Sequence, residues 1–259
     1  MGRGSALFRF PIGGGQFDPF RIEPMKISVI IPARNEESFI GGCLESIETA
    51  AENFDGEVEV IVVLNRCTDK TEEIARRYCA SIVHEDGKNL ARIRNRGAEA
   101  ATGDVIATID ADSRMTPNML QEIGRRLRTG ECIGGGVTIL PERLSLGILV
   151  SMLLLLPYGI VHRISAGLFW CFRSDFLAIG GFNDSLITLE DVDFAKRLKA
   201  HGKRQGRRFK TIMRAHIVTS CRKFDQFGDW YFVLNPRFVR RLITGNPKAA
   251  DSYFYEIKR

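Results

Sequence analysis

The chain has 259 residues, of which 44% are hydrophobic and 26% are charged, so it can bury a core and is too apolar for a disordered protein. Its net charge of +6 and isoelectric point near 9.1 favour anionic partners without choosing between phosphorylated small molecules, nucleic acid and an acidic membrane surface. Its six cysteines form no C-x-x-C pair and have no histidine at zinc spacing. This argues against a zinc site and indicates reduced thiols in a cytoplasmic protein.

The first 24 residues lack the apolar run of a signal peptide and are predicted to form a disordered extension. Residues 25–259 are expected to form a single domain. In its first half, β-branched runs at 27–31, 58–64, 81–84 and 105–109 alternate with helical patterns at 38–53, around 74–78 and at 89–101. This alternation predicts a Rossmann-like α/β fold with a mainly parallel central sheet flanked by helices.

The second half is less regular, with a helix predicted from 117 to 128 and a Gly-rich strand from 132 to 140. The segment 144–161 is strongly apolar and contains Pro157. It is shorter than the roughly 20 residues of a membrane-spanning helix, which argues against a transmembrane segment. A buried or partner-facing pair of helices is the favoured interpretation, and a segment lying in a membrane surface is the alternative.

Three polar loops follow the first, second and fourth predicted strands. Their sequences are P-A-R-N-E-E, N-R-C-T-D-K-T and D-A-D. Ligands of parallel sheets bind beyond the carboxyl ends of the strands, where such loops converge. These loops therefore predict a site at one edge of the sheet.

Two acidic motifs have the chemistry that such a site needs. Asp110-Ala111-Asp112 ends a predicted strand, and two carboxylates one residue apart can share a hard cation such as Mg²⁺ or Mn²⁺. Glu190-Asp191 can take a proton from an attacking hydroxyl. The alternatives are solvated acids in a turn for the first motif and a capped helix over 192–200 for the second.

The ordered set V-I-I-P-A-R-N-E-E, V-V-L-N-R-C-T-D-K-T, R-N-R-G-A-E-A-A-T-G-D, D-A-D and G-G-F-N-D-S-L-I-T-L-E-D-V-D-F-A-K-R-L resembles the family 2 glycosyltransferases of the GT-A fold. The resemblance covers about residues 26–210. It implies an inverting, metal-dependent enzyme that moves one sugar from a nucleotide-activated sugar, UDP-linked by family habit, to an acceptor hydroxyl. It also divides the domain into a nucleotide-binding half, 25–115, and an acceptor-binding half, 116–259. No Q-x-x-R-W motif follows, so a non-processive enzyme is expected.

The resemblance also implies roles for individual residues. Asp191 is expected to be the catalytic base, with Glu190 beside it or touching the acceptor. Asp112 is assigned chiefly to the metal, Asp110 to the nucleotide or the metal, and His216 is a further metal candidate. His216 and the T-S-C-R-K segment after it fall where relatives place late diphosphate or metal contacts. The expected donor-binding residues are Pro32, Arg34, Asn35, Glu36, Asn65, Asp69, Lys88, Arg94, Asp110 and Ala111.

The expected partners are a nucleotide-sugar donor and an acceptor, without nucleic acid. The apolar segment 144–161 and the basic charge leave open a lipid-linked acceptor and a peripheral contact with the inner face of the membrane. One rival function is nucleotidyl transfer to a sugar phosphate, against which the first loop, lacking glycine, argues. The other is a non-catalytic anion-binding protein. The four acids of the two motifs argue against it, because clustered carboxylates do not favour the binding of anions.

Overall fold

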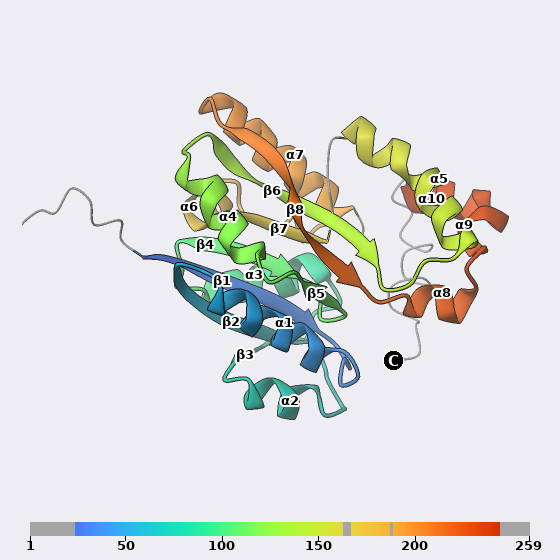
Figure 1. The fold of residues 1–259 in the computed structure, drawn as a ribbon, viewed down its shortest axis with the longest axis horizontal. Helices are drawn as coiled ribbons and strands as arrows, with labels where there is room; N and C mark the ends of the chain where they lie inside the picture. The colour runs from blue at the N-terminus through green and yellow to red at the C-terminus, as the bar shows by residue number, and fades with distance from the viewer. Residues whose placement is uncertain (1–23, 163–166, 187–188, 244–259) are drawn as a thin grey trace, which may run out of the picture.

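The computed structural model describes residues 24–162, 167–186 and 189–243, and within them eight strands form one sheet with helices on both faces (Figure 1). The strands are β1 (Met25–Ala33), β2 (Gly56–Leu64), β3 (Ser81–His84), β4 (Val105–Ile109), β5 (Ser113–Met115), β6 (Cys132–Pro141), β7 (Leu168–Phe172) and β8 (Arg208–Thr219). The helices are α1 (Ile40–Glu52), α2 (Thr71–Arg77), α3 (Leu90–Ala100), α4 (Met119–Arg128), α5 (Leu146–His162), α6 (Arg173–Ala178), α7 (Glu190–Arg204), α8 (Arg222–Phe227), α9 (Tyr231–Leu234) and α10 (Pro236–Ile243). The predicted α/β fold is confirmed.

The strand order is β3-β2-β1-β4-β7-β6-β8-β5. β1 pairs in parallel with β2 and β4, β2 with β3, and β6 with β8, whereas β7 and β5 are antiparallel to their neighbours. Because β7 runs antiparallel to both β4 and β6, β4 and β6 point the same way. The carboxyl ends of β1, β2, β4, β6 and β8 therefore lie at one edge of the sheet, as the polar loops predict.

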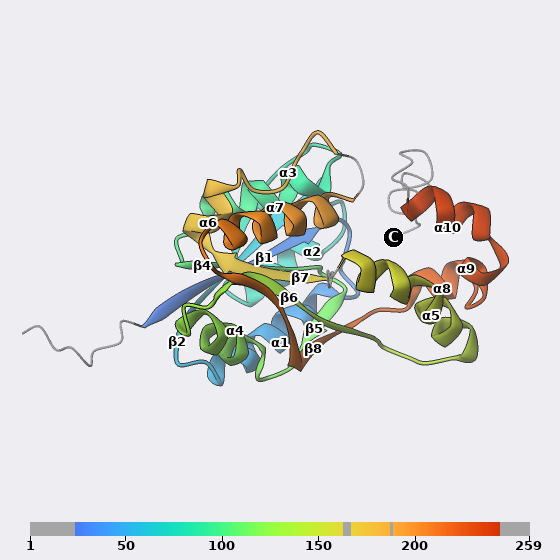
Figure 2. The ribbon, with the colours of Figure 1, turned by 90° about the horizontal axis from the view of Figure 1, so that it is seen from above.

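The central strands bury both faces, because successive side chains point to opposite sides of a sheet. In β1, Val29 and Ile31 join the core beneath α1 and α4, whereas Ile30 joins the core beneath α3 and α7. Figure 2 shows these two helical layers on opposite sides of the sheet. The sheet thus has the rigidity that a site on its edge requires.

The segment 144–161 differs from its prediction. It contains one 17-residue helix, α5, whose backbone continues through Pro157, instead of a pair of helices. A proline inside a helix removes one backbone hydrogen bond and often kinks the helix, but it need not end it. Of the helices in the described ranges, none is both long enough and apolar enough to cross a bilayer. The predicted extension, residues 1–24, lies outside the described residues apart from Pro24.

Gly97 lets α3 approach the sheet closely. A methyl group at this position would lie 2.4 Å from Cγ2 of Ile30 and 2.9 Å from Cγ2 of Val63. Alanine usually stabilises a helix over glycine by roughly 0.5–1 kcal/mol, but here we expect Gly97→Ala to lower the free energy of unfolding by about 1–3 kcal/mol through overpacking. Urea denaturation measures whether the substitution lowers or raises the free energy of unfolding. The control Glu99→Ala, exposed on the same helix, should change stability by less than about 0.5 kcal/mol, and a stabilised Gly97→Ala would contradict the close packing.

Candidate active site

The loops after β1 and β2 are bound to each other. Asn35 accepts a hydrogen bond from the backbone N–H of Thr68 at 2.8 Å, and the N–H of Glu36 donates to the Thr71 hydroxyl at 2.8 Å. Asn35 has a φ of +52°, a left-handed conformation that asparagine tolerates better than most residues. The polar loops after β1 and β2 therefore form one rigid unit.

Two predicted donor-binding side chains are engaged in holding these loops. Asn65 donates to the carbonyl oxygens of Glu85 and Gly87, the latter at 2.9 Å. The Asp69 carboxylate accepts from the N–H and hydroxyl of Thr71 at 3.0 and 2.6 Å and from a backbone N–H of the first loop. Although burial alone would raise the pKa of Asp69, these hydrogen bonds outweigh it and lower the pKa. Asp69 is therefore a firmly ionised member of the loop.

Four other predicted donor-binding residues have simpler settings. Pro32 is buried at the end of β1, and Ala111 is buried between the two aspartates of D-A-D. Arg34 is half-buried in the first loop, whereas Lys88 is exposed in the loop between β3 and α3. Lys88 and Arg34 thus border the same edge of the sheet from two different loops.

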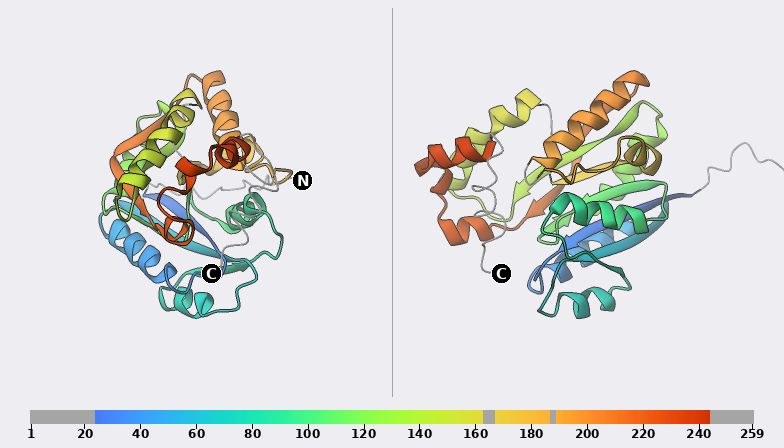
Figure 3. Two further views of the ribbon diagram at one scale, coloured as in Figure 1. Left: turned by 90° about the vertical axis from the view of Figure 1, so that its right-hand side faces the viewer. Right: turned by 180° about the vertical axis from the view of Figure 1, so that it is seen from behind.

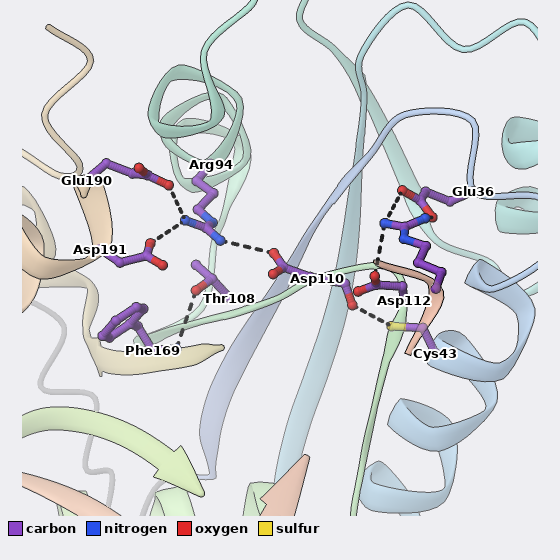
Figure 4. A network of polar contacts seen from close by, with 10 residues as sticks. Glu36, Cys43, Arg94, Thr108, Asp110, Asp112, Phe169, Glu190 and Asp191 are labelled. Atoms are coloured by element: carbon purple, nitrogen blue, oxygen red, sulfur yellow. Dashed lines mark hydrogen bonds and ion pairs between the residues drawn. The ribbon is translucent and has the colours of Figure 1, made fainter. Parts of the chain in front are cut away.

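Arg94 of α3 joins the two acidic motifs. Its guanidinium donates to Asp110 at 3.0 Å, to Asp191 at 2.6 Å and to Glu190 at 3.4 Å (Figure 4). The side chain is only 4% exposed and lies 5.2 Å from the ring centroid of Phe182. Carboxylates from the end of β4 and from the start of α7 thus share one buried cation, and Arg94, predicted to bind the donor, here binds protein carboxylates.

Two carboxylates beside Arg94, those of Glu190 and Asp191, hold protons more tightly than ordinary acids. Burial and the neighbouring Asp191 raise the pKa of Glu190 to about 7. Burial also raises the pKa of Asp191, with Arg94 acting in the opposite direction and Asp110 adding to the rise. A buried carboxylate with a raised pKa is a stronger proton acceptor than an exposed one, which suits a general base near neutral pH.

A second arginine holds the other half of the site. Arg222, at the start of α8, binds Glu36 at 2.6 and 3.1 Å and Asp112 at 2.9 Å. Its guanidinium lies 5.2 Å from the ring centroid of Phe39. The hydroxyl of Ser220 also donates to Asp112, at 3.1 Å. Of the T-S-C-R-K segment, Ser220 and Arg222 therefore reach the D-A-D motif.

His216 does not reach Asp112, so its predicted place among the metal ligands is not supported. Its backbone pairs with Thr116 through hydrogen bonds of 3.1 and 3.2 Å, whereas Asp112 is opposite Ser220. Four residues of strand separate the two positions, or about 13 Å at roughly 3.3 Å per residue. The register of β5 with β8 is the physical reason.

The D-A-D residues fit a divalent cation that takes its other ligands from substrate. Asp110 and Asp112 provide hard carboxylate oxygens, and Asp112 already attracts a positive group, the Arg222 guanidinium. Within the described ranges, no group of three or more His, Cys, Asp or Glu side chains can hold a metal ion. Mg²⁺ is usually held by one or two carboxylates together with phosphates and water, so this set suits a metal–diphosphate pair better than a closed protein site.

Two asparagines outside the predicted site, one within α3 and one at its N-cap, fix the loop that leads to the acidic pair. Asn95 accepts from the N–H of Phe182 and donates to its carbonyl oxygen, both at 2.8 Å. Asn89 caps α3 and donates to the carbonyl oxygens of Asp184 and Leu186. Asn95 stands inside the R-N-R-G motif, but its partner is 87 residues away, and no local pattern indicates it.

Comparisons with known proteins agree with this fold. Residues 28–143 match the model described as Glycosyl transferase family 2. The amylovoran biosynthesis glycosyltransferase AmsB of Erwinia amylovora is 26% identical over 255 residues, covering 85% of this chain and 81% of AmsB. EpsH of Bacillus subtilis and the low-salt glycan biosynthesis hexosyltransferase Agl6 of Haloferax volcanii are 30% and 33% identical, each over 40% of this chain. Here the chain spans only 31% of EpsH and 25% of Agl6.

Solved structures resemble the whole described fold. S. aureus TarS 1-349 in complex with UDP-GlcNAc gives a TM-score of 0.62 at 17% identity, covering 90% of this chain and 71% of that one. The mannosyltransferase PcManGT from Pyrobaculum calidifontis, in complex with GDP-Man and Mn²⁺, gives 0.60 at 17% identity, covering 88% and 70%. At these identities the likeness concerns the fold. The likeness shows that the chain has the GT-A fold, and the family match places residues 28–143 in glycosyl transferase family 2.

Proposed function

We propose that the chain transfers one sugar from a nucleoside-diphosphate sugar, preferentially a UDP-sugar, to an acceptor hydroxyl with inversion at the anomeric carbon. The observation that carries this proposal is the Arg94 network, in which Asp110 of D-A-D and Asp191 of E-D-V-D bind one buried guanidinium at 3.0 and 2.6 Å. Donor binding and proton removal need carboxylates in one cleft, and these two come from opposite halves of the chain.

On the donor side, Glu36 is proposed to bind the ribose, and Asp110 and Asp112 to hold Mg²⁺ or Mn²⁺ beside the diphosphate. A divalent cation there neutralises the charge that develops on the leaving nucleoside diphosphate. The structures of PcManGT and of the Mycobacterium tuberculosis glucosyl-3-phosphoglycerate synthase, both solved with Mn²⁺, support this assignment by analogy. Arg222 already holds Glu36 and Asp112 in place.

On the acceptor side, Asp191 is proposed as the general base. Direct displacement requires the acceptor hydroxyl to lose its proton as its oxygen attacks, and a buried carboxylate with a raised pKa can take that proton. Arg94 orients Asp191 through the 2.6 Å hydrogen bond. Glu190, next to it, is proposed to contact the acceptor. A membrane-proximal or lipid-linked acceptor at the cytoplasmic face completes the proposal.

Donor binding and product analysis test the proposal. We expect the melting temperature to rise with one nucleoside diphosphate among UDP, GDP, dTDP and CDP, and to rise further with Mn²⁺, since a ligand at 100 times its Kd stabilises by about 2.7 kcal/mol. Asp112→Asn should lose the increment due to Mn²⁺, whereas the exposed control Asp55→Asn should keep it. Turnover should release nucleoside diphosphate. Release of pyrophosphate would instead establish nucleotidyl transfer, and no shift with any nucleotide would contradict donor binding.

A further inference from the structure

Four helices form a lobe beside the candidate active site. The helical lobe, defined as α5, α8, α9 and α10, extends from one edge of the sheet (Figures 2 and 3). α5 follows β6 and α8 follows β8, and the carboxyl ends of both strands lie at the edge where β4 ends. The lobe therefore borders the D-A-D motif, which Arg222 at the start of α8 contacts directly.

One face of α5 presents large apolar side chains to solvent. The exposed fraction is 66% for Leu146, 47% for Leu149, 57% for Leu153 and 53% for Leu154. Leu146, Leu149 and Leu153 are spaced three and four residues apart, so they lie along one face of the helix. Residues 144–161 contain no charged side chain. A contiguous apolar row of this kind is unusual on a soluble protein and marks an interaction surface.

The opposite face of α5 is packed, which fixes the direction of the exposed leucines. Gly147, Ile148 and Ser151 are buried. A methyl group at Gly147 would lie 2.9 Å from the backbone of Asp229, and the Ser151 hydroxyl donates to the Asp229 carbonyl oxygen at 3.4 Å. The helix therefore cannot roll to bury Leu149 and Leu153 without losing this contact.

Two acids of the lobe near α5 share one cation, Arg143, which offsets their charge in part. Arg143 binds Asp225 at 2.5 Å and Asp229 at 2.8 Å, and the hydrogen bonds from Arg143 lower the pKa of Asp229 to about 2. In formal charge, Arg143, Asp225 and Asp229 together carry −1. The three arginines of α10 outweigh this charge near an anionic surface.

α10 adds an exposed basic face to the lobe. Arg237, Arg240 and Arg241 are exposed, and their spacing of three and four residues places them on one side of the helix. Phe238, by contrast, packs on Tyr231 with the ring centroids 5.3 Å apart. The arginine side of α10 thus faces outward because its aromatic side is held by α9.

We propose that the helical lobe docks on an anionic bilayer, with the leucine row of α5 in the interface and the arginines of α10 among the headgroups. α5 lies on such a surface instead of crossing it, since no helix in the described part of the chain can span a bilayer. The charge selects this occupant over a second copy, which would bring an equally basic lobe against the first. Docking places the D-A-D edge beside the membrane. This inference does not depend on the transfer reaction proposed above.

Vesicle flotation tests the proposal without any substrate. The full chain should bind vesicles of phosphatidylcholine mixed with phosphatidylglycerol more tightly than vesicles of phosphatidylcholine alone, and added salt should weaken that binding. The double variant Leu149→Gln with Leu153→Gln should lose roughly tenfold or more in partitioning to both vesicles. Arg237→Gln should lose about fivefold on the anionic vesicles and nothing on the neutral ones.

Matched controls come from the far edge of the sheet. Leu177, 55% exposed in α6, and Arg204, exposed at the end of α7, lie away from the lobe, so Leu177→Gln and Arg204→Gln should bind vesicles like the native chain. Unchanged circular dichroism and melting temperature show that the variants fold. The proposal would be overturned by equal binding to both vesicles, by binding that the leucine substitutions do not change, or by no binding. It would also be overturned if light scattering showed a dimer that the leucine substitutions dissociate, while the native chain does not bind vesicles.

Discussion

Asp191→Asn is expected to lower turnover by about two to four orders of magnitude, the usual contribution of a general base, while donor binding stays unchanged. Asparagine keeps the shape of the side chain and an oxygen that can accept the 2.6 Å hydrogen bond from Arg94, so the site should keep its geometry and lose only a proton acceptor. Steady-state kinetics with donor and acceptor, together with nucleoside-diphosphate titration, separate these two effects.

The matched control is Asp193→Asn, the same chemical change two residues further along α7. Asp193 pairs with Arg197 at 2.6 Å, whereas Arg94 binds Asp191, Glu190 and Asp110, so this variant should retain turnover close to that of the native chain. Near-normal transfer by Asp191→Asn would show that the base lies elsewhere. Glu190 would then be the next candidate, because it shares Arg94 and has a pKa raised to about 7.

Arg94→Met should destabilise the fold by about 3–5 kcal/mol near pH 8, since it leaves buried carboxylates without their cation. The penalty should shrink as the pH falls. Without Arg94, the folded-state pKa of Glu190 rises above its native value of about 7, far above its ordinary value near 4.5. The extra cost of the variant is therefore complete above its own folded pKa, decreases as the pH falls from there toward about 7, and is absent below about 7, where Glu190 is protonated in both folded proteins.

Urea denaturation at several pH values between 8 and 5 measures this dependence. Arg92→Met is the control on the same helix. Arg92 is largely exposed and pairs with Glu85 at 2.9 Å, and an exposed pair of this kind contributes about 1 kcal/mol or less. A loss for Arg94→Met that is equally large at every pH would mean that packing on Phe182, rather than charge, is the main contribution of Arg94.

The first half of the fold follows from local sequence periodicity. The strands predicted at 81–84 and 105–109 have those boundaries in the structure, and the predicted helix 89–101 is observed as Leu90–Ala100 with Asn89 as its cap. The second half was harder to predict because β7 is a short aromatic run, L-F-W-C-F, and β8 mixes basic and apolar residues. Both strands gain their stability from neighbours distant in the chain, which no local pattern encodes.

In the candidate site, too, part of the structure follows from local sequence and part depends on contacts between distant segments. The carboxylates themselves stand in recognisable motifs, whereas the partner of each is set by tertiary structure. Arg222 is 186 residues from Glu36 along the chain, and the register of β8 decides that Ser220, and not His216, meets Asp112. The charge of a residue indicates that its side chain can take part in binding or catalysis. Strand register decides which other side chains it contacts.

The Arg222 guanidinium occupies the place beside Asp112 that a bound metal ion would take. Any divalent cation that binds Asp112 competes with a guanidinium already there, so its affinity for the protein alone is reduced by the work of displacing that group. A diphosphate arriving with the cation offers the released guanidinium a new anion, which lowers this cost. The two ligands are then thermodynamically linked, and each strengthens the binding of the other by the same factor.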